Sequence, residues 1–241
     1  MDISTKYRLL TRMPLLQGLS GQDLARLEET HGLEVECISP SHTPLLNQGD
    51  ACTHLILVAS GTLRRTHRTE DGRLTVSAQQ QTPAAIEPEN LYGLHCHYRN
   101  TYTAESELHT ISIRKTDVGK CLMNAPIFRY NLLNYLSAVA HKQSLLLTPR
   151  RPGTAQDKFL HLMESLCKED DTAITLNVKM TDLALYIEET RLTVSRMLNH
   201  LASLGGIGIA RSTITIASLH ALQAHLRSKH EGADDTKETH I

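Results

Sequence analysis

Apolar residues in the last third of the chain recur with the period of an α-helix. Leu183 and Ile187 lie four residues apart, which predicts a short helix, and small Ala184 suits the close crossing of a second one. Thr190 is a good N-cap for that second helix, because its hydroxyl can accept a hydrogen bond from a free backbone amide at the helix start. The second helix carries one apolar stripe, formed by Val194, Met197, Leu198, Leu201 and Leu204. The pattern predicts a helix-turn-helix.

The opposite face of the second helix carries hydrogen-bond donors and no acid. Its residues are Arg191, Ser195, Arg196 and Asn199. Such donors suit the DNA major groove, where guanine presents two acceptors and adenine a donor and an acceptor. The alternative is an ordinary amphipathic helix with a solvated face, and the helix pair alone leaves the two interpretations even.

Two short alternating segments follow the second helix and shift that balance. Residues 207–209 and 214–216 flank a polar turn, which predicts a small β-hairpin. Arg211 would lie at the hairpin tip, where it can meet a DNA phosphate. A hairpin directly after the second helix is typical of a winged helix-turn-helix, so we expect the chain to bind double-stranded DNA.

In the first half of the chain the apolar period changes from helical to two. A capping box at Ser20–Asp23 predicts a helix start. Short strands are then predicted at 33–38, 43–46, 54–58, 62–66, 74–77, 101–104 and 109–113. Glycines mark turns between them. Many short strands with regular turns predict a β-barrel or β-roll sandwich rather than a parallel α/β sheet.

Residues 127–147 are predicted to form one long helix. Its apolar positions alternate in spacings of four and three, as on a coiled-coil seam: Leu132, Leu136, Val139, Gln143 and Leu146, widened by Leu133, Ala140 and Leu147. Part of this stripe is expected to pack on its own domain. Because the stripe is wide and leads into a DNA-reading domain, we also expect it to form a homodimer that recognises two half-sites.

Composition narrows the class of protein. The chain has 241 residues and a formal net charge of −1, so DNA binding must depend on a local basic patch. No apolar run suits a membrane span and no signal peptide is visible, so we expect a cytoplasmic protein without a membrane partner. The five cysteines are scattered without paired spacing, which fits reduced thiols. The common catalytic motifs of enzymes are missing from the sequence, so we expect no enzymatic activity.

Taken together, these segments resemble the Crp/Fnr family of bacterial transcription regulators. The resemblance covers the chain up to its tail and lies in residues 14–20, the turns at Gly49, Gly61 and Gly72, residues 91–104, the long helix, and residues 190–196 with the hairpin. It implies a near-palindromic promoter site, bound by a homodimer under the control of an effector, and contact with RNA polymerase. A sensor or scaffold that no longer binds DNA is the alternative.

The fold class implied is α+β. An N-terminal double-stranded β-helix or jelly-roll sensor domain, cyclic-nucleotide-binding-like, is expected over 1–125, followed by a dimerisation helix over 126–148 and a hinge over 149–153. The winged helix-turn-helix domain is expected over 154–227. The tail, 228–241, has almost nothing to bury and is predicted to be disordered.

Departures from the family pattern bear on the effector. Members that bind cyclic AMP carry a glutamate for the ribose and an arginine for the phosphate, at positions matched here to Asn90 and Tyr102. Without that cation the phosphate would be desolvated with little compensation, so we expect no response to cyclic AMP. The iron-sulfur cluster of the Fnr branch is also not expected, since no cysteine precedes Cys37. The effector pocket is predicted from Asn90, Leu91, Tyr102, Thr103, Gln143 and Ser144.

The segment His95-Cys96-His97 offers an alternative cofactor. Haem-binding members of the family take an axial Cys or His ligand from this stretch, so a haem- or redox-sensing protein is an open alternative. The plainer interpretation, which the sequence favours, is a surface loop with incidental histidines in a chain that has 14 of them. One tripeptide sets neither the ligand geometry nor a second axial ligand.

Leu192 departs from the pattern on the DNA-reading face. Many family members have a glutamate there, whose carboxylate can accept a hydrogen bond from cytosine. Leucine can instead pack on the methyl group of thymine, so an A·T pair is predicted at this position. Arg196 is the candidate for guanine, and Arg191 and Thr193 are expected at phosphate or a neighbouring base. Alternatively, Leu192 packs on the wing or a neighbouring helix and reads nothing.

Overall fold

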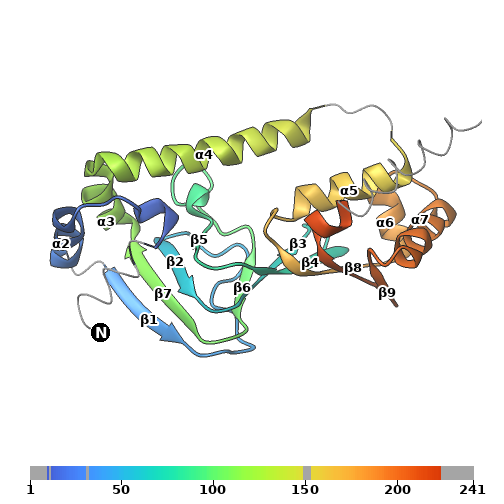
Figure 1. Cartoon of the computed structure of the whole chain (residues 1–241), viewed down its shortest axis with the longest axis horizontal. Helices are drawn as coiled ribbons and strands as arrows, with labels where there is room; N and C mark the ends of the chain where they lie inside the picture. Colours follow the sequence, from blue (N-terminus) through green and yellow to red (C-terminus); the bar gives the residue numbers. More distant parts are fainter. Residues whose placement is uncertain (1–9, 11, 31–32, 149–152, 224–241) are drawn as a thin grey trace, which may run out of the picture. The chain divides into compact units, whose positions relative to one another are not determined.

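The structure is a computed structural model that describes residues 10, 12–30, 33–148 and 153–223. The predicted tail and nearly all of the predicted hinge lie outside the described residues. The chain divides into two compact units (Figure 1). The first unit comprises Met1–Arg65 and Gln80–Leu147, and the second comprises Thr66–Gln79 and Thr148–Ile241. Within the described residues, no helix is both long and apolar enough to cross a membrane.

The first unit is built on an antiparallel sheet with the strand order β1-β7-β2-β5. These strands are β1 (Leu33–Ile38), β2 (His54–Ser60), β5 (Ala84–Ile86) and β7 (Leu108–Arg114). β6 (Thr101–Ala104) lies beside β3 (Leu63–Arg68), along which the chain passes into the second unit. With the helices, this arrangement confirms the predicted α+β class.

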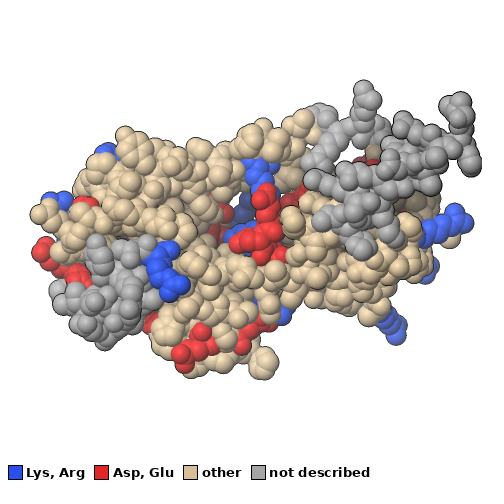
Figure 2. Space-filling model, viewed as in Figure 1, with Lys and Arg blue, Asp and Glu red and all other residues tan. Residues whose placement is uncertain are grey.

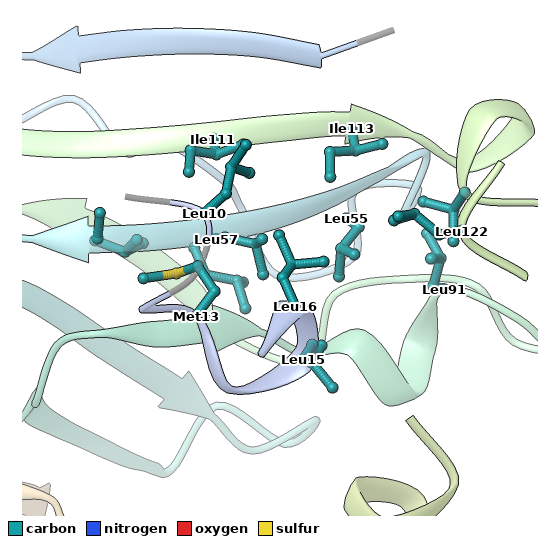
Figure 3. Packing of buried hydrophobic residues seen from close by; sticks show 14 of the residues in the cluster. Leu10, Met13, Leu15, Leu16, Leu55, Leu57, Leu91, Ile111, Ile113 and Leu122 are labelled. Atoms are coloured by element: carbon teal, nitrogen blue, oxygen red, sulfur yellow. The ribbon is translucent and has the colours of Figure 1, made fainter. Parts of the chain in front are cut away.

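The core of the first unit lies between the sheet and the N-terminal helices. Leu55 and Leu57 of β2 and Ile111 and Ile113 of β7 point toward Leu16 of η1 (Pro14–Leu16) (Figure 3). The alternating burial along β2 and β7 follows from the pleat, which turns successive side chains to opposite faces. The predicted capping box starts α2 (Gly21–Glu29), where the Ser20 side chain accepts from the amide of Asp23.

The long helix α4 (Pro126–Leu147) is preceded by α3 (Lys115–Lys120), by η3 (Leu122–Asn124) and by η2 (Pro88–Asn90) further upstream. Phe128 and Leu132 are the buried residues of α4. Beyond them the helix exposes large apolar side chains to solvent: Leu133 is 57% exposed, Leu145 54% and Leu147 84%. Most of α4 therefore presents apolar surface that this chain does not cover within its described residues.

The second unit contains α5 (Ala155–Leu166), β8 (Thr172–Val178), α6 (Met180–Tyr186), α7 (Arg191–Ser203), β9 (Gly208–Ala210) and β10 (Thr213–Ser218). It also contains the end of β3 and most of β4 (Leu74–Gln80). β4 pairs antiparallel with β8, with Val76 opposite Leu176. Leu74 and Val76 are wholly buried among the apolar residues of this unit.

The hairpin of β3 and β4 does not follow the domain boundaries expected from the order of the chain, because Thr66–Gln79 belongs to the second unit. Those boundaries placed residues 62–77 in the N-terminal β-roll. In the structure the distal part of the hairpin shares the core and the sheet of the helix-turn-helix. The physical reason is strand pairing at long range, because β8 offers an unpaired edge that a local sequence pattern cannot reveal.

Two other details differ from the predicted strands. Residues 43–46 form no strand, and only Leu46 makes an isolated bridge, to Tyr102. Pro44 has no backbone N–H to donate to a ladder, which accounts for the difference. The short strand β5 was not predicted, since it has three residues and follows Pro83. The remaining predicted strands are present.

Candidate nucleic-acid interface and ligand cavity

The turn between α6 and α7 is a Schellman motif, which closes a helix end with backbone hydrogen bonds. The amide of Glu189 donates to the carbonyl of Ala184 at 2.9 Å. The amide of Glu188 donates to the carbonyl of Leu185 at 3.2 Å. Glu188 has a φ of 52°, a conformation that glycine usually adopts at this position. Leu183 and Ala184 are buried, as the helix pairing predicted.

Lys158 of α5 holds this turn from outside. Its ammonium group donates to the carbonyl of Glu188 at 3.2 Å and to the carboxylate of Glu189 at 2.7 Å. Carbonyls at the end of a helix lack intrahelical partners, so donors from elsewhere in the chain satisfy them. The lysine thus fixes the angle at which the second helix leaves the turn. Lys158 lies 30 positions before Glu188, and no local pattern in the sequence links the two residues, so this contact could not be predicted.

α7 starts at its predicted cap. The Thr190 hydroxyl accepts from the amide of Thr193 at 3.1 Å. The predicted apolar stripe is buried at Val194, Met197, Leu198 and Leu201, whereas Leu204 is only half-buried because it caps the helix end. The predicted DNA-reading residues share the other face: Arg191, Leu192, Arg196 and Asn199 are exposed, and Thr193 and Ser195 are half-buried.

The predicted wing is present as the antiparallel pair of β9 and β10. Arg211 and Ser212 form its turn, Arg211 is exposed, and Ser212 takes a φ of 57°. The amide of Val178 donates to the carbonyl of Ser212 at 3.0 Å, which ties the wing turn to the end of β8. The wing tip is therefore held in place while its arginine side chain points into solvent.

The exposed face of α7 and the wing tip carry positive charge. Arg191, Arg196 and Arg211 form no ion pair with another residue of the described ranges. Figure 2 shows Lys and Arg side chains projecting from the surface of the second unit. Uncompensated cations at exposed positions attract a polyanion such as DNA, even though the whole chain is nearly neutral.

A cavity of about 530 Å³ lies in the first unit against α4. It is lined by Glu89, Asn90, His95, His97, Tyr98, Arg99, Leu136, Val139, Ala140 and Gln143. Its walls combine both signs of charge with an apolar helix face. The Tyr135 hydroxyl of α4 donates to the carboxylate of Glu89 at 2.9 Å, which ties η2 to the helix. Of the predicted pocket residues, the cavity brings together Asn90 and Gln143.

The other predicted pocket residues lie elsewhere. Leu91 and Tyr102 are buried in the core, at 2% and 0% exposure. Thr103 is half-buried on β6 and Ser144 is exposed on α4, and neither lines the cavity. Arg99 and Glu89 line it instead, which the sequence did not indicate. Charged residues in a loop carry no periodic pattern by which they could have been identified.

Tyr102 belongs to a buried polar network centred on Glu87. The Glu87 side chain is 2% exposed and its carboxylate accepts from the Tyr102 hydroxyl at 3.0 Å and from the side-chain amide of Asn90 at 2.7 Å. It also accepts from the backbone amide of Arg99 at 2.6 Å and from the Asn100 side chain. Burial raises the pKa of Tyr102 well above its usual value, so the phenol stays neutral. Four donors thus compensate one buried carboxylate.

The His95-Cys96-His97 segment does not converge on one point. His95 and His97 line the cavity, whereas Cys96 does not. The Cys96 sulfur accepts from the Lys115 ammonium at 3.4 Å and lies 3.3 Å from the carbonyl of Gly93. Lys115 also stacks 5.1 Å from the centre of the Tyr92 ring. A thiol held in this way is not aimed at the cavity, so the three residues do not fit as a common haem site.

The five cysteines are all free, in agreement with the predicted reduced thiols. Within the described residues, the only cluster of three potential metal ligands is a separate one, formed by Cys37, Glu107 and His109.

Comparison with known proteins identifies the second unit. Residues 158–225 match the model of the Crp-like helix-turn-helix domain. No curated protein matches the chain. A transcriptional regulator of the crp/fnr family from Eubacterium rectale has a similar structure, with a TM-score of 0.50 and 18% sequence identity over 90% of this chain and 99% of that one. The catabolite activator protein of Thermus thermophilus matches with a TM-score of 0.48 and 19% identity over 89% and 99%.

Proposed function

We propose that this protein is a transcription regulator of the Crp/Fnr type that binds double-stranded DNA, because residues 158–225 match the Crp-like helix-turn-helix domain. One observation carries the proposal. The exposed face of α7 presents Arg191, Arg196 and Asn199 without an acid, beside a wing that ends in Arg211. A helix of this kind fits the major groove, and a wing arginine fits a phosphate.

Base reading is assigned to the exposed middle of this face. Arg196 forms two hydrogen bonds with guanine, and Leu192, at 59% exposure, packs on the methyl group of thymine. Thr190, Arg191, Thr193 and Arg211 contact phosphate or a neighbouring base, while Ser195 and Asn199 lie along the same face. The exposure of Leu192 supports this role, because an apolar side chain of that size contacts water in the free protein and loses that contact on DNA.

The protein binds DNA as a homodimer formed through α4. Leu133 and Leu147, which lie on the same face of this helix, are more than half exposed, and no described residue covers them. A second copy of α4 would bury this surface and place two recognition helices against two half-sites of a near-palindromic promoter. RNA polymerase is the further partner of a regulator bound at a promoter.

A small effector occupies the cavity between η2, the loop that carries His95 and His97, and α4. A ligand there touches η2 and its following loop as well as the dimerisation helix, so it can favour one arrangement of that helix over another. Cyclic AMP is not this effector. The position matched to the phosphate-binding arginine is Tyr102, which is buried, donates to the Glu87 carboxylate and does not line the cavity, so it supplies no cation for a cyclic phosphate.

Selection of bound sites from genomic DNA, followed by electrophoretic shifts at several salt concentrations, tests the DNA-binding function. We expect a near-palindromic site whose affinity falls steeply with salt. Arg196→Ala should weaken the site by about 1–3 kcal/mol and relax one position in each half-site. Arg26→Ala, an exposed arginine on α2, is the matched control and should leave DNA affinity unchanged. Failure to select any sequence would favour a sensor or scaffold without DNA binding.

A further inference from the structure

Cys37 and His109 are direct partners across the ladder of β1 and β7. Side chains of directly opposed residues in an antiparallel pair lie on the same face of the sheet. Glu107 comes directly before β7, two residues before His109, and its carboxylate lies near the Cys37 and His109 side chains. The fold therefore brings a thiol, an imidazole and a carboxylate together from two segments 70 positions apart.

The three side chains are close enough to share one ion. Their ligand atoms all lie within 4.8 Å of one another. Around a tetrahedral zinc ion with bonds of about 2.0–2.3 Å, ligand atoms lie roughly 3.5 Å apart. The remaining difference is small enough for rotation of exposed side chains. Cys37 and Glu107 are exposed and His109 is half-buried, so an ion can enter and two of the ligands can adjust.

The Nδ1 atom of His109 already has a hydrogen-bond partner, which leaves Nε2 of the ring for a metal. The Ser60 hydroxyl of β2 lies 3.2 Å from Nδ1 of His109, across the other side of β7. Metal-bound histidines usually use one ring nitrogen for the metal and the other for such a hydrogen bond, which fixes the ring and its tautomer. This second contact distinguishes the cluster from a chance meeting of surface side chains.

We propose that Cys37, Glu107 and His109 bind a Zn²⁺ ion. Sulfur, nitrogen and oxygen ligands in one set suit zinc, whereas calcium and magnesium take oxygen ligands alone. Three protein ligands leave a fourth position for water. The ion links the edge strand β1 to β7, and the thiol gives up its proton when it binds. This site is separate from the DNA-binding face and from the cavity against α4.

Titration of the full chain with Co²⁺ and Zn²⁺ after removal of metal by a chelator tests this proposal. We expect one equivalent of Co²⁺ to bind with a thiolate-to-cobalt charge-transfer band and the intense visible bands of tetrahedral cobalt, and Zn²⁺ to displace it. Cys37→Ser should abolish the charge-transfer band, and His109→Gln should weaken binding at least tenfold. Both substitutions are small and sit at positions that are not fully buried, and circular dichroism checks that the fold is kept.

Cys121→Ser and His42→Gln are the matched controls, since these residues lie outside the cluster and should leave the cobalt spectrum unchanged. A band that persists in Cys37→Ser, or that disappears in Cys121→Ser instead, overturns the assignment. So does binding of equal strength in the wild-type protein and in His109→Gln. DNA binding is measured in parallel, so that loss of the metal site and loss of the regulator function remain distinguishable.

Discussion

The hydroxyl group of Tyr186 donates to the Asp71 carboxylate, at 2.8 and 2.9 Å from its two oxygens. Asp71 lies in the turn between β3 and β4, and Tyr186 is the last residue of α6, the first helix of the helix-turn-helix. Arg73, in the same turn, lies 4.0 Å from Asp182 of α6. The hairpin of β3 and β4, which comes early in the chain, is thus a structural part of the unit that contains the helix-turn-helix.

The pKa of Asp71 provides a test of this contact. Hydrogen bonds from the Thr69 hydroxyl, the Arg73 amide and Tyr186 hold that pKa below its usual value. A carboxyl group with a depressed folded pKa contributes stability above its unfolded pKa, near 3.9, and loses it as the pH falls through the folded value. We expect Asp71→Asn to lower the urea midpoint at pH 7 and to make it less sensitive to acid.

Urea unfolding followed by circular dichroism at pH 7 and at pH values down to about 3 would measure this effect, since the unfolded pKa lies near 3.9. Tyr186→Phe should reproduce part of the loss at pH 7. Asp170→Asn, an exposed carboxylate of the same unit, is the control. An equal change of the urea midpoint in Asp170→Asn would show that the effect comes from the loss of one negative charge and not from the hydrogen bonds of Asp71.

A substitution at Leu74 tests whether the hairpin of β3 and β4 packs in the core of the second unit. Its side chain is wholly buried in the core of the second unit. Leu74→Ala should reduce the free energy of unfolding of that unit by about 2–5 kcal/mol, because it removes apolar contacts and leaves a cavity. Leu185→Ala, at 68% exposure, should change it by no more than about 0.5 kcal/mol. Equal values for the two variants would mean that the hairpin is not part of the core.

Leu192 tests which base pair the recognition helix reads. We expect Leu192→Glu to shift the preference at one position of each half-site from A·T toward a pair whose cytosine can donate to the carboxylate. The discrimination should be about 1–3 kcal/mol per base pair. Selection of preferred sites before and after the substitution measures this. Unchanged preferences at every position would place Leu192 outside the reading set.

The exposed face of α4 tests the homodimer. Leu133→Arg combined with Leu147→Arg should place two charges in the proposed interface, and we expect sedimentation to show a monomer and DNA affinity to fall. Leu185→Arg is the control for sedimentation, because Leu185 is 68% exposed on α6 of the second unit. If the double variant still sediments as a dimer, the dimer forms through another surface.

The helix-turn-helix could be predicted from the sequence because its determinants are local. The Thr190 cap and the apolar stripe of α7 depend on residues three and four apart, and the wing depends on a turn between two short strands. The same holds for the capping box at Ser20, which the structure contains as predicted. The Crp/Fnr resemblance followed from the order of such local elements.

Tertiary structure alone decided which distant segments meet. Glu87 carries no pattern that predicts its burial among Tyr102, Asn90 and Asn100, because its donors come from a separate loop and strand. Pairing of β4 with β8 and of Cys37 with His109 likewise depends on strand register across long separations. Local propensities do not specify such pairings, since they are selected by the burial that the whole fold achieves.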